Sequence, residues 1–258
     1  MDQEIQRAII LGIVQGLTEF LPVSSTAHLI LFPWFFGWHG DIDSLTFDVA
    51  LHGGTLLALL VCFYKDWLEL LTKERQKLGF ILAAVVPAGV VGILFKGFIE
   101  HQLRNPLIMV ATLTLFGVVM LAAEKLSPKN RDSVSFKDAL FIGMAQAIAL
   151  IPGVSRSGIT ITAGLFRGLS RESAARFSFL LSTPVIAGAT LLECRKLIKN
   201  PGAYNLDMFS VGFLASFISG FFAIKFLLAY LKKYPLNAFV YYRFGLAVVI
   251  AAAYFRMQ

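Results

Sequence analysis

The composition of this 258-residue chain is that of a membrane protein. Hydrophobic residues make up 57% of it and charged residues 15%, whereas soluble domains are about 45–50% apolar and about 25% charged. The formal net charge of +7 does not indicate nucleic acid as a partner, because the basic residues stand in short segments between apolar runs, where they meet lipid head groups or set topology. Membrane lipids are therefore the expected surroundings, and the composition excludes a soluble domain.

The first two apolar segments, residues 8–21 and 27–37, flank the sequence LPVSST. Each is shorter than the roughly 20 residues that a helix needs to cross a bilayer. Polar, proline-containing backbone is tolerated at membrane depth only inside protein or beside a water-filled cavity. The two segments therefore predict a re-entrant helix-loop-helix pair. Three longer segments follow and are expected to cross the membrane: residues 48–64, 78–95 and 107–123.

The second half of the chain has the same order of segments. Residues 139–151 and 158–168 flank PGVSRS and predict a second re-entrant pair, whose loop should face the first in the interior. Three further spans are expected at residues 176–192, 209–230 and 239–255. The predicted fold class is an all-α polytopic integral membrane protein with six transmembrane helices and two re-entrant helix-loop-helix pairs.

An internal repeat accompanies this order. Gly12 and Gly143, 131 residues apart, each begin the pattern Gly-x-x-Gln, and a serine follows each of them twelve residues later. Each half then has one re-entrant pair and three crossings. Because three is odd, the second half should be inverted relative to the first. We expect one membrane domain, residues 1–258, made of inverted repeats over about 1–125 and 132–258, with a site near the midplane where broken helices meet.

The basic residues predict the orientation of the chain. On this topology the side opposite both termini carries about twice as many lysines and arginines as the side that holds them, and basic loops usually face the cytoplasm. We therefore expect the termini and the first re-entrant pair on the outer side of the membrane, with the site opening to that periplasmic side.

Gln15 and Glu19 are four residues apart in the first short segment, so a helix places them on one face. Burying an unpaired carboxylate is so unfavourable that Glu19 must be protonated, matched by a cation or bound to a metal. A neutral, hydrogen-bonded glutamate that braces the helix is the structural alternative.

The loop of the first pair carries a cluster of hydroxyls and a histidine. Pro22 ends the first half-helix, and Ser24, Ser25 and Thr26 are candidates for the N-cap of the second. His28 lies three residues after Ser25, near enough on a helical face to activate the serine or to protonate a leaving oxygen. A structural histidine is the alternative.

The loop of the second pair combines glycines, hydroxyls and an arginine. Glycines let backbone N–H groups approach an anion, the N-terminus of the following half-helix is electropositive, and a guanidinium fits phosphate oxygens. An arginine at membrane depth also needs a partner, so a salt bridge between Arg156 and Glu19 is an alternative role that is compatible with anion binding. The residues expected at this anion site are Gly153, Ser155, Arg156, Ser157, Gly158 and Thr160.

Two other groups of polar residues are less informative. Asp48 and His52, four apart at the start of the first long span, are candidates for the mouth of the site, but an aspartate at a helix start is commonly a cap. A structural role is the interpretation we favour for them. The charged run at residues 65–77 is predicted to be a solvated loop.

These features lead to an anion site inside the membrane, and two classes of protein have one. An enzyme that acts on a phosphorylated lipid would use Ser25, His28 and Arg156 for phosphoryl transfer. A secondary transporter or flippase for a phosphate-bearing lipid or another anion would also have inverted repeats and broken helices. The residues alone do not decide between them.

A family resemblance favours the enzyme. QGLTEFLPVSSTAH, residues 15–28, resembles the first motif of the bacterial undecaprenyl pyrophosphate phosphatases of the bacitracin-resistance type, and IPGVSRSGIT, residues 151–160, is similar to their second motif. Length, segment order and FDVALHGGTLLAL also match. The resemblance implies removal of the terminal phosphate of a polyprenyl diphosphate in the bacterial inner membrane, which recycles the lipid carrier of cell-wall synthesis and confers bacitracin resistance.

The resemblance also implies roles for residues. We expect Ser25 to attack the terminal phosphorus while His28 handles its proton, although attack by water or by His28 is an alternative. Glu19 would bind Mg²⁺ or Ca²⁺ or orient water, and Gln15 stands where many members carry glutamate, so it is a second candidate ligand. A homodimer is a further expectation. The residues expected to hold phosphate oxygens are Ser24, Thr26, Gly153, Ser155, Arg156, Ser157 and Thr160.

Overall fold

The computed structural model describes residues 3–95, 97–98, 102–103, 105–199 and 205–256, without the side chains of residues 193–199. Within these ranges the regular structure is helical and no strand is present. The elements are α1 (Gln3–Phe20), α2 (Ser25–Phe36), the 3₁₀ helix η1 (Asp41–Asp43), α3 (Leu45–Cys62), α4 (Tyr64–Thr72), α5 (Arg75–Leu94), α7 (Pro106–Leu126), α8 (Phe136–Ile148), α9 (Arg156–Phe166), α10 (Arg171–Lys199), α11 (Leu206–Leu231) and α12 (Asn237–Arg256).

The six expected spans are confirmed as α3, α5, α7, α10, α11 and α12, which are long and apolar enough to cross a membrane. Several of these helices begin a few residues before the apolar run, because a polar cap sets the helix end. The side chain of Ser44 accepts a hydrogen bond from the backbone of Phe47 at the start of α3. Asn105 caps α7 through Leu107 in the same way. Each cap satisfies one of the free N–H groups of the first turn.

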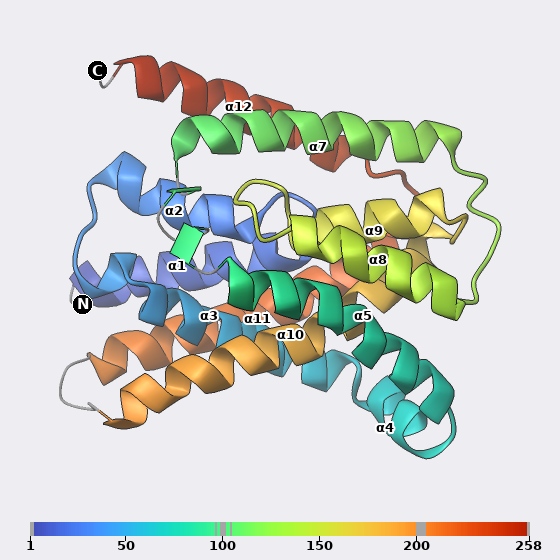
Figure 1. Ribbon diagram of the computed structural model, residues 1–258. Coiled ribbons are helices and arrows are strands. Elements are labelled where there is room, and N and C mark those ends of the chain that lie inside the picture. Colours follow the sequence, from blue (N-terminus) through green and yellow to red (C-terminus); the bar gives the residue numbers. More distant parts are fainter. Residues whose placement is uncertain (1–2, 96, 99–101, 104, 200–204, 257–258) are drawn as a thin grey trace.

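The four short helices form two broken hairpins. Figure 1 shows α1 and α2 entering from the end that holds both termini, while α8 and α9 enter from the opposite end, and the two breaks meet in the middle of the molecule. Glycines bring each hairpin close to a long helix. A Cβ on Gly12 would lie 2.5 Å from the carbonyl oxygen of Gly212 in α11, and one on Gly143 would lie 2.3 Å from that of Ala84 in α5. The same position of the sequence repeat thus makes the close contact in both halves.

The two breaks also share an unusual backbone. Ser24, the N-cap of α2, has φ 75° and ψ 91°, and Ser155, the N-cap of α9, has φ 73° and ψ 114°. A positive φ is uncommon for residues other than glycine and is held only where the surroundings impose it. Ser24 and Ser155 are 131 residues apart, as the sequence repeat requires. Both hairpins therefore turn by the same local geometry.

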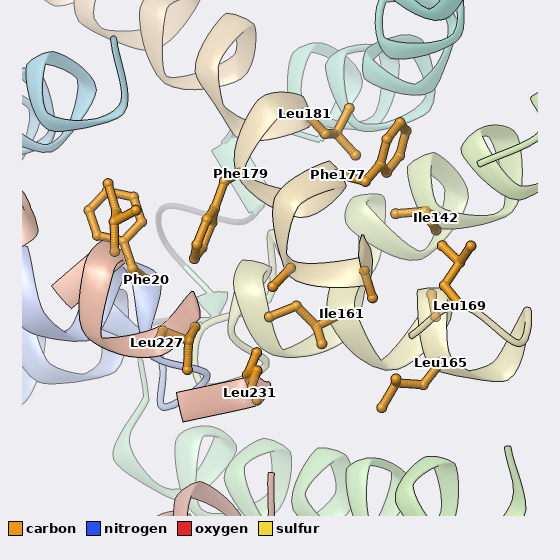
Figure 2. Close-up of a cluster of buried hydrophobic side chains, with 14 of the residues drawn as sticks. Phe20, Ile142, Ile161, Leu165, Leu169, Phe177, Phe179, Leu181, Leu227 and Leu231 are labelled. Atoms are coloured by element: carbon orange, nitrogen blue, oxygen red, sulfur yellow. The ribbon is translucent and has the colours of Figure 1, made fainter. Parts of the chain in front are cut away.

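The main hydrophobic core joins the hairpins to the long helices. Figure 2 shows Phe20, at the end of α1, facing Phe179 of α10. Their ring centroids are 5.4 Å apart in an edge-to-face arrangement, which aromatic pairs favour. Ile161 and Leu165 of α9 and Ile142 of α8 belong to the same core. Packing of this core thus fixes the breaks of both hairpins relative to α10.

The prediction of a solvated loop at residues 65–77 is wrong. Tyr64–Thr72 form α4, and Arg75 begins α5. Leu70 is buried, while most of the charged side chains remain exposed. The segment is helical because one apolar face packs on α5, which the charge pattern alone did not reveal. With parts of α5 and α10 it lines a cavity of about 220 Å³ at the end of the molecule away from the termini.

Candidate active site

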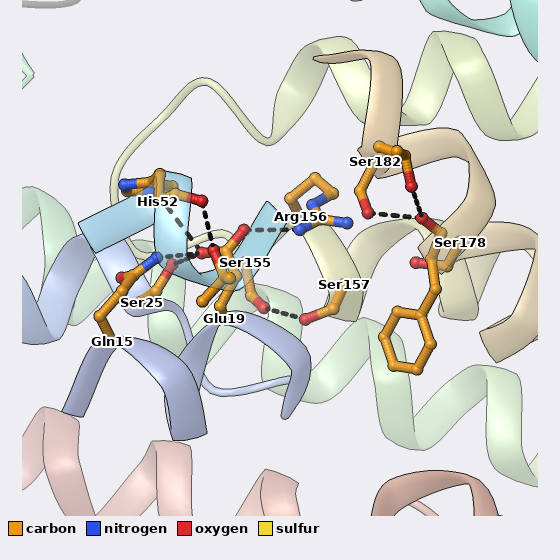
Figure 3. Close-up of polar contacts among 12 residues, drawn as sticks. Gln15, Glu19, Ser25, His52, Ser155, Arg156, Ser157, Ser178 and Ser182 are labelled. Carbon is orange, nitrogen blue, oxygen red and sulfur yellow. Dashed lines mark hydrogen bonds and ion pairs between the residues drawn. The ribbon is translucent and has the colours of Figure 1, made fainter. Parts of the chain in front are cut away.

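Glu19 lies at the centre of a buried polar cluster. Its Oε2 accepts hydrogen bonds from Ser25 Oγ at 2.5 Å and from Gln15 Nε2 at 3.1 Å. Arg156 Nη2 donates to Oε1 at 2.5 Å, and His52 Nε2 lies 3.5 Å from Oε2. Figure 3 shows these side chains converging on the carboxylate from α1, α2, α3 and α9. The predicted salt bridge between the two hairpins is therefore present.

Local helix geometry explains how these groups meet. Gln15 and Glu19 are one helical turn apart at the end of α1, so both side chains point the same way. Ser25 begins α2 and Arg156 begins α9, directly after the N-caps Ser24 and Ser155. The free N–H groups and the positive ends of both helix dipoles therefore lie at the meeting point of the breaks. Such a place stabilises an anion, as phosphate sites at helix N-termini do.

The cluster opens into a cavity of about 200 Å³. One part of its wall is polar and comes from both hairpins and α3. The other part is apolar, and α5, α10 and the break after α8 form it. A cavity with a polar and an apolar wall suits a small anionic group that carries a hydrocarbon tail. The polar lining is Glu19, Ser24, Ser25, Thr26, His52, Gln146, Ser155 and Arg156, and the apolar lining is Ala88, Ala149, Leu150, Val185, Ile186 and Ala189.

His28 does not pair with Ser25, so that expectation is wrong. Its Nδ1 lies 2.7 Å from the carbonyl oxygen of Ser24, and its Nε2 lies 2.7 Å from the hydroxyl of Tyr242. Because a carbonyl oxygen only accepts, Nδ1 carries a hydrogen, and in the neutral ring Nε2 accepts from Tyr242. The ring is not part of the cavity lining. The spacing of three residues puts Ser25 and His28 near each other on the helix surface, but packing turns Ser25 toward α1 and His28 toward α12.

Three expected phosphate ligands support the loops and do not line the cavity. Ser157 Oγ donates to the carbonyl oxygen of Leu21 at 3.1 Å and so ties one break to the other. Thr160 is fully buried, with its hydroxyl 2.7 Å from the carbonyl of Arg156. Gly153 has φ +89°, and a Cβ there would lie 2.0 Å from Thr112 Oγ1. The turn and this close packing both require a glycine at position 153. The three residues thus support the loops in this structure, and their contact with an anion stays a prediction.

His52 belongs to the site, contrary to the structural role that we favoured. Its Nδ1 lies 2.7 Å from the carbonyl oxygen of Asp48, so the hydrogen is on Nδ1 and Nε2 is directed at Glu19. The sequence could have indicated His52, because it is an ionisable residue inside an apolar span and such residues are mostly functional. The spacing of four residues from Asp48 favoured a role at the helix start, and it contained no information about the neighbouring hairpin.

Residues 8–249 match the family model described as bacitracin resistance protein BacA. The chain belongs to this family. The protein of Thermodesulfovibrio yellowstonii called undecaprenyl-diphosphatase is 58% identical over 98% of both chains. Proteins of the same name from Rubrobacter xylanophilus and Moorella thermoacetica are 47% and 45% identical, over 96% and 97% of this chain and 98% of each relative. The two motifs quoted from the sequence thus lie in a BacA chain that is similar to these relatives along nearly its whole length.

A further residue of this BacA chain holds the breaks together and was missed in the sequence. Arg243 of α12 is fully buried. Its guanidinium reaches carbonyl groups of α7 and of both hairpin breaks, so one side chain ties three segments together. The sequence could have indicated Arg243, because an arginine inside an apolar span is rare and needs partners. The acceptors are the carbonyl oxygens of Gly153 at 3.0 Å, Val154 at 3.1 Å, Leu113 at 3.2 Å, Pro22 at 3.3 Å and Thr112 at 3.4 Å.

The donor atoms around Glu19 fit a divalent cation only in part. Within the described ranges no group of three or more His, Cys, Asp or Glu side chains is placed to hold a metal ion. The Glu19 carboxylate and the amide oxygen of Gln15 are the oxygen donors at hand, and this amide oxygen is buried without a hydrogen-bond partner among those residues. Mg²⁺ is commonly held by one or two carboxylates together with phosphate oxygens and water. The pair therefore supplies only part of the coordination of such a cation, and oxygens of a diphosphate would supply the rest.

Proposed function

We propose that this protein is an undecaprenyl-diphosphatase, which converts undecaprenyl diphosphate and water to undecaprenyl phosphate and inorganic phosphate. The observation that carries the proposal is the 2.5 Å hydrogen bond from Ser25 Oγ to Glu19 Oε2, beside Arg156, in a buried cavity between two helix N-termini. A nucleophile in contact with a base, next to a phosphate-binding cation, is the arrangement that phosphoryl transfer through a covalent intermediate needs.

In the first step Ser25 Oγ attacks the terminal phosphorus. Glu19 Oε2 accepts the hydroxyl proton, because it already accepts the Ser25 hydrogen bond. The new Oγ–P bond replaces the bond from phosphorus to the bridging oxygen, and undecaprenyl phosphate leaves as an anion that needs no proton. Arg156 turns from Glu19 to the transferred phosphoryl group and stabilises its equatorial oxygens.

In the second step water attacks the phosphoserine. The P–Oγ bond breaks, and Glu19 returns its proton to Ser25 Oγ while the hydrogens of water stay on the released phosphate. His52 Nε2, 3.5 Å from Oε2 of Glu19, orients the carboxylate toward Ser25. The free N–H groups at the starts of α2 and α9 hold phosphate oxygens in both steps. Ser25, Glu19 and Arg156 thus end the cycle as they began it.

Glu19 and Gln15 would hold a divalent cation, Mg²⁺ or Ca²⁺, together with oxygens of the diphosphate. When bound, the cation supplies charge neutralisation on the leaving phosphate. The substrate phosphate would replace Glu19 as the partner of Arg156, which would leave the Glu19 carboxylate free to hold the cation. Gln15 is an amide, so it would supply an oxygen to the cation but no negative charge.

The apolar wall of the cavity supports a lipid substrate. Val185, Ile186 and Ala189 of α10 and Ala88 of α5 continue from the polar part of the lining. The first isoprene units would lie against these side chains, while the rest of the long chain stays among the lipids. We place the protein in the bacterial inner membrane with the site open to the outer side, because the end of the molecule that carries α4 is the more basic one.

The test compares phosphate release with transport. Purified protein in sealed liposomes is given undecaprenyl diphosphate and, separately, labelled inorganic phosphate. We expect release of phosphate from the lipid and no accumulation of label inside the vesicles. Uptake of label without release from the lipid would instead establish the second candidate, a transporter, which the meeting of two broken hairpins favours. The Ser25 and Glu19 pair favours hydrolysis, because transport needs neither a nucleophile nor a base.

A further inference from the structure

Gln146 of α8 lines the cavity but takes no part in the chemistry described above. Its side chain is 2% exposed. Neither the nitrogen nor the oxygen of its amide has a hydrogen-bond partner among the described residues. Exchanging the positions of the amide nitrogen and oxygen would therefore leave both atoms without a partner as well. A buried amide without partners is unfavourable, and it is satisfied when a ligand or water supplies the missing hydrogen bonds.

The sequence repeat explains why this amide has no protein partner. Gln146 occupies the position that Gln15 occupies in the first half, 131 residues earlier. Gln15 donates to Glu19, one helical turn further on. The position that corresponds to Glu19 in the second half is Leu150, whose side chain has no hydrogen-bond acceptor. At the equivalent repeat position, Gln15 in α1 is therefore hydrogen-bonded to a carboxylate, whereas the amide of Gln146 in α8 lines the cavity without a protein partner.

A second polar group in the same cavity points to the kind of ligand. Arg156 Nη2 is paired with Glu19, but Arg156 Nη1 is buried and, within the part of the chain described, has no acceptor. Two N–H donors that lack acceptors, Nη1 of Arg156 and the amide nitrogen of Gln146, thus belong to one cavity of about 200 Å³. A phosphate group offers several acceptor oxygens at once. A protonated phosphate oxygen or a bound water also supplies the donor that the amide oxygen of Gln146 lacks.

We propose that Gln146 is a substrate-binding residue whose amide nitrogen donates a hydrogen bond to a phosphate oxygen of the diphosphate, on the wall contributed by the second half. This proposal rests on the proposed function, because it assigns the ligand of the same site. Arg156 and Gln146 then hold the phosphate from α9 and α8, while Ser25 and Glu19 reach it from the first half.

The test is the substitution Gln146→Met, which keeps the length of the side chain and removes both polar atoms. Because no described residue bonds to the amide, the variant should melt at the wild-type temperature or higher. Its kcat/KM for undecaprenyl diphosphate should fall by about tenfold or more, since a hydrogen bond to a charged phosphate is lost. Gln146→Glu should lower kcat/KM further, because a carboxylate repels the phosphate.

The matched control is Gln76→Met, at an exposed position of α5. It should change neither the melting temperature nor kcat/KM.

A second measurement separates this proposal from the proposed function. Methylenediphosphonate, which cannot be hydrolysed, should raise the melting temperature of the wild type, because a ligand that binds only the folded state stabilises it. The rise should be smaller for Gln146→Met. A wild type that shows this rise but releases no phosphate would refute the hydrolysis and leave the Gln146 contact standing. A Gln146→Met variant with kcat/KM within about twofold of wild type and an unchanged ligand-induced rise, or with a lowered melting temperature without ligand, would overturn the assignment.

Discussion

Arg156 and Glu19 are 137 positions apart in the chain, yet Nη2 of the arginine lies 2.5 Å from Oε1 of the glutamate, with both side chains largely buried. Removing one partner of a buried ion pair leaves an uncompensated charge in a medium that cannot hydrate it. The pair therefore does two things. It joins the breaks of the two hairpins, and in the proposed mechanism it keeps Arg156 in place until a phosphate takes over from Glu19.

Glu19→Gln is expected to lower kcat for phosphate release by at least about 100-fold, because the amide cannot accept the proton of Ser25. The variant should also melt at a lower temperature, since Arg156 loses its counter-charge. Both effects are measured on purified protein in detergent with undecaprenyl diphosphate. The matched control is Asp66→Asn, which breaks the more exposed ion pair of Asp66 and Arg176 and should leave kcat within about twofold. Equal losses in the two variants would contradict the role of Glu19 as base.

Ser25→Ala is expected to reduce kcat by about 1,000-fold or more, because the nucleophile is removed. Thr26→Val removes a hydroxyl from the same cavity and should raise KM while changing kcat much less. Rapid mixing with the labelled lipid, followed by acid quench, should trap a phosphorylated form of the wild type that Ser25→Ala does not make. Near wild-type phosphate release by Ser25→Ala would rule the serine out and favour direct attack by water.

Arg243→Met is expected to destabilise the protein and to lower kcat together, because three carbonyl acceptors at the hairpin breaks and two on α7 lose their donor. Each acceptor left buried and unsatisfied costs about 1–3 kcal/mol, reduced where water can enter. Arg243→Lys should restore part of the stability, since an ammonium group reaches some of these carbonyls but lacks the planar fork. Thermal unfolding in detergent measures the effect. Wild-type stability of Arg243→Met would show that the breaks hold their geometry without this clamp.

Asp138 lies at the start of α8, outside the membrane-spanning helices. We expect its carboxyl group to make the stability of the fold depend on pH. Burial raises the pKa of this carboxyl, but hydrogen bonds from Arg131, Ser135 and Arg167 outweigh burial and hold the pKa well below its usual range. A folded-state pKa below the unfolded value of about 4 means that the stabilisation is complete above that pH and is lost as the pH falls through the folded value. Asp138 therefore stabilises the fold at neutral pH.

Asp138→Asn should accordingly melt at a lower temperature than the wild type at pH 7. The difference between the two proteins should shrink as the pH is lowered below about 4, because the unfolded wild-type chain then binds a proton at Asp138 that the folded carboxyl takes up only at lower pH. Melting curves at a series of pH values measure it. A difference that stays constant from pH 7 into the acid range would show that the charge of Asp138 does not stabilise the fold.

The sequence alone was sufficient for the spans and for the two breaks, and it offered the pairing of Glu19 with Arg156 as one role of the arginine. These features depend on quantities that are local in the chain. An apolar run of sufficient length crosses a bilayer, a proline next to hydroxyls interrupts a helix in lipid, and one buried anion and one buried cation need each other. The family resemblance, carried by two short motifs, led to the same residues.

The tertiary structure decided which way each polar side chain points. His28 turned out to face Tyr242, while His52 and Gln146 line the cavity, and Arg243 reaches both breaks from the last helix. Successive residues on a helix point about 100° apart, so the residue that faces a site depends on how the helix is rotated about its axis. That rotation is set by packing against helices far away in the sequence, such as the close contact of Gly12 with α11, and no local pattern contains it.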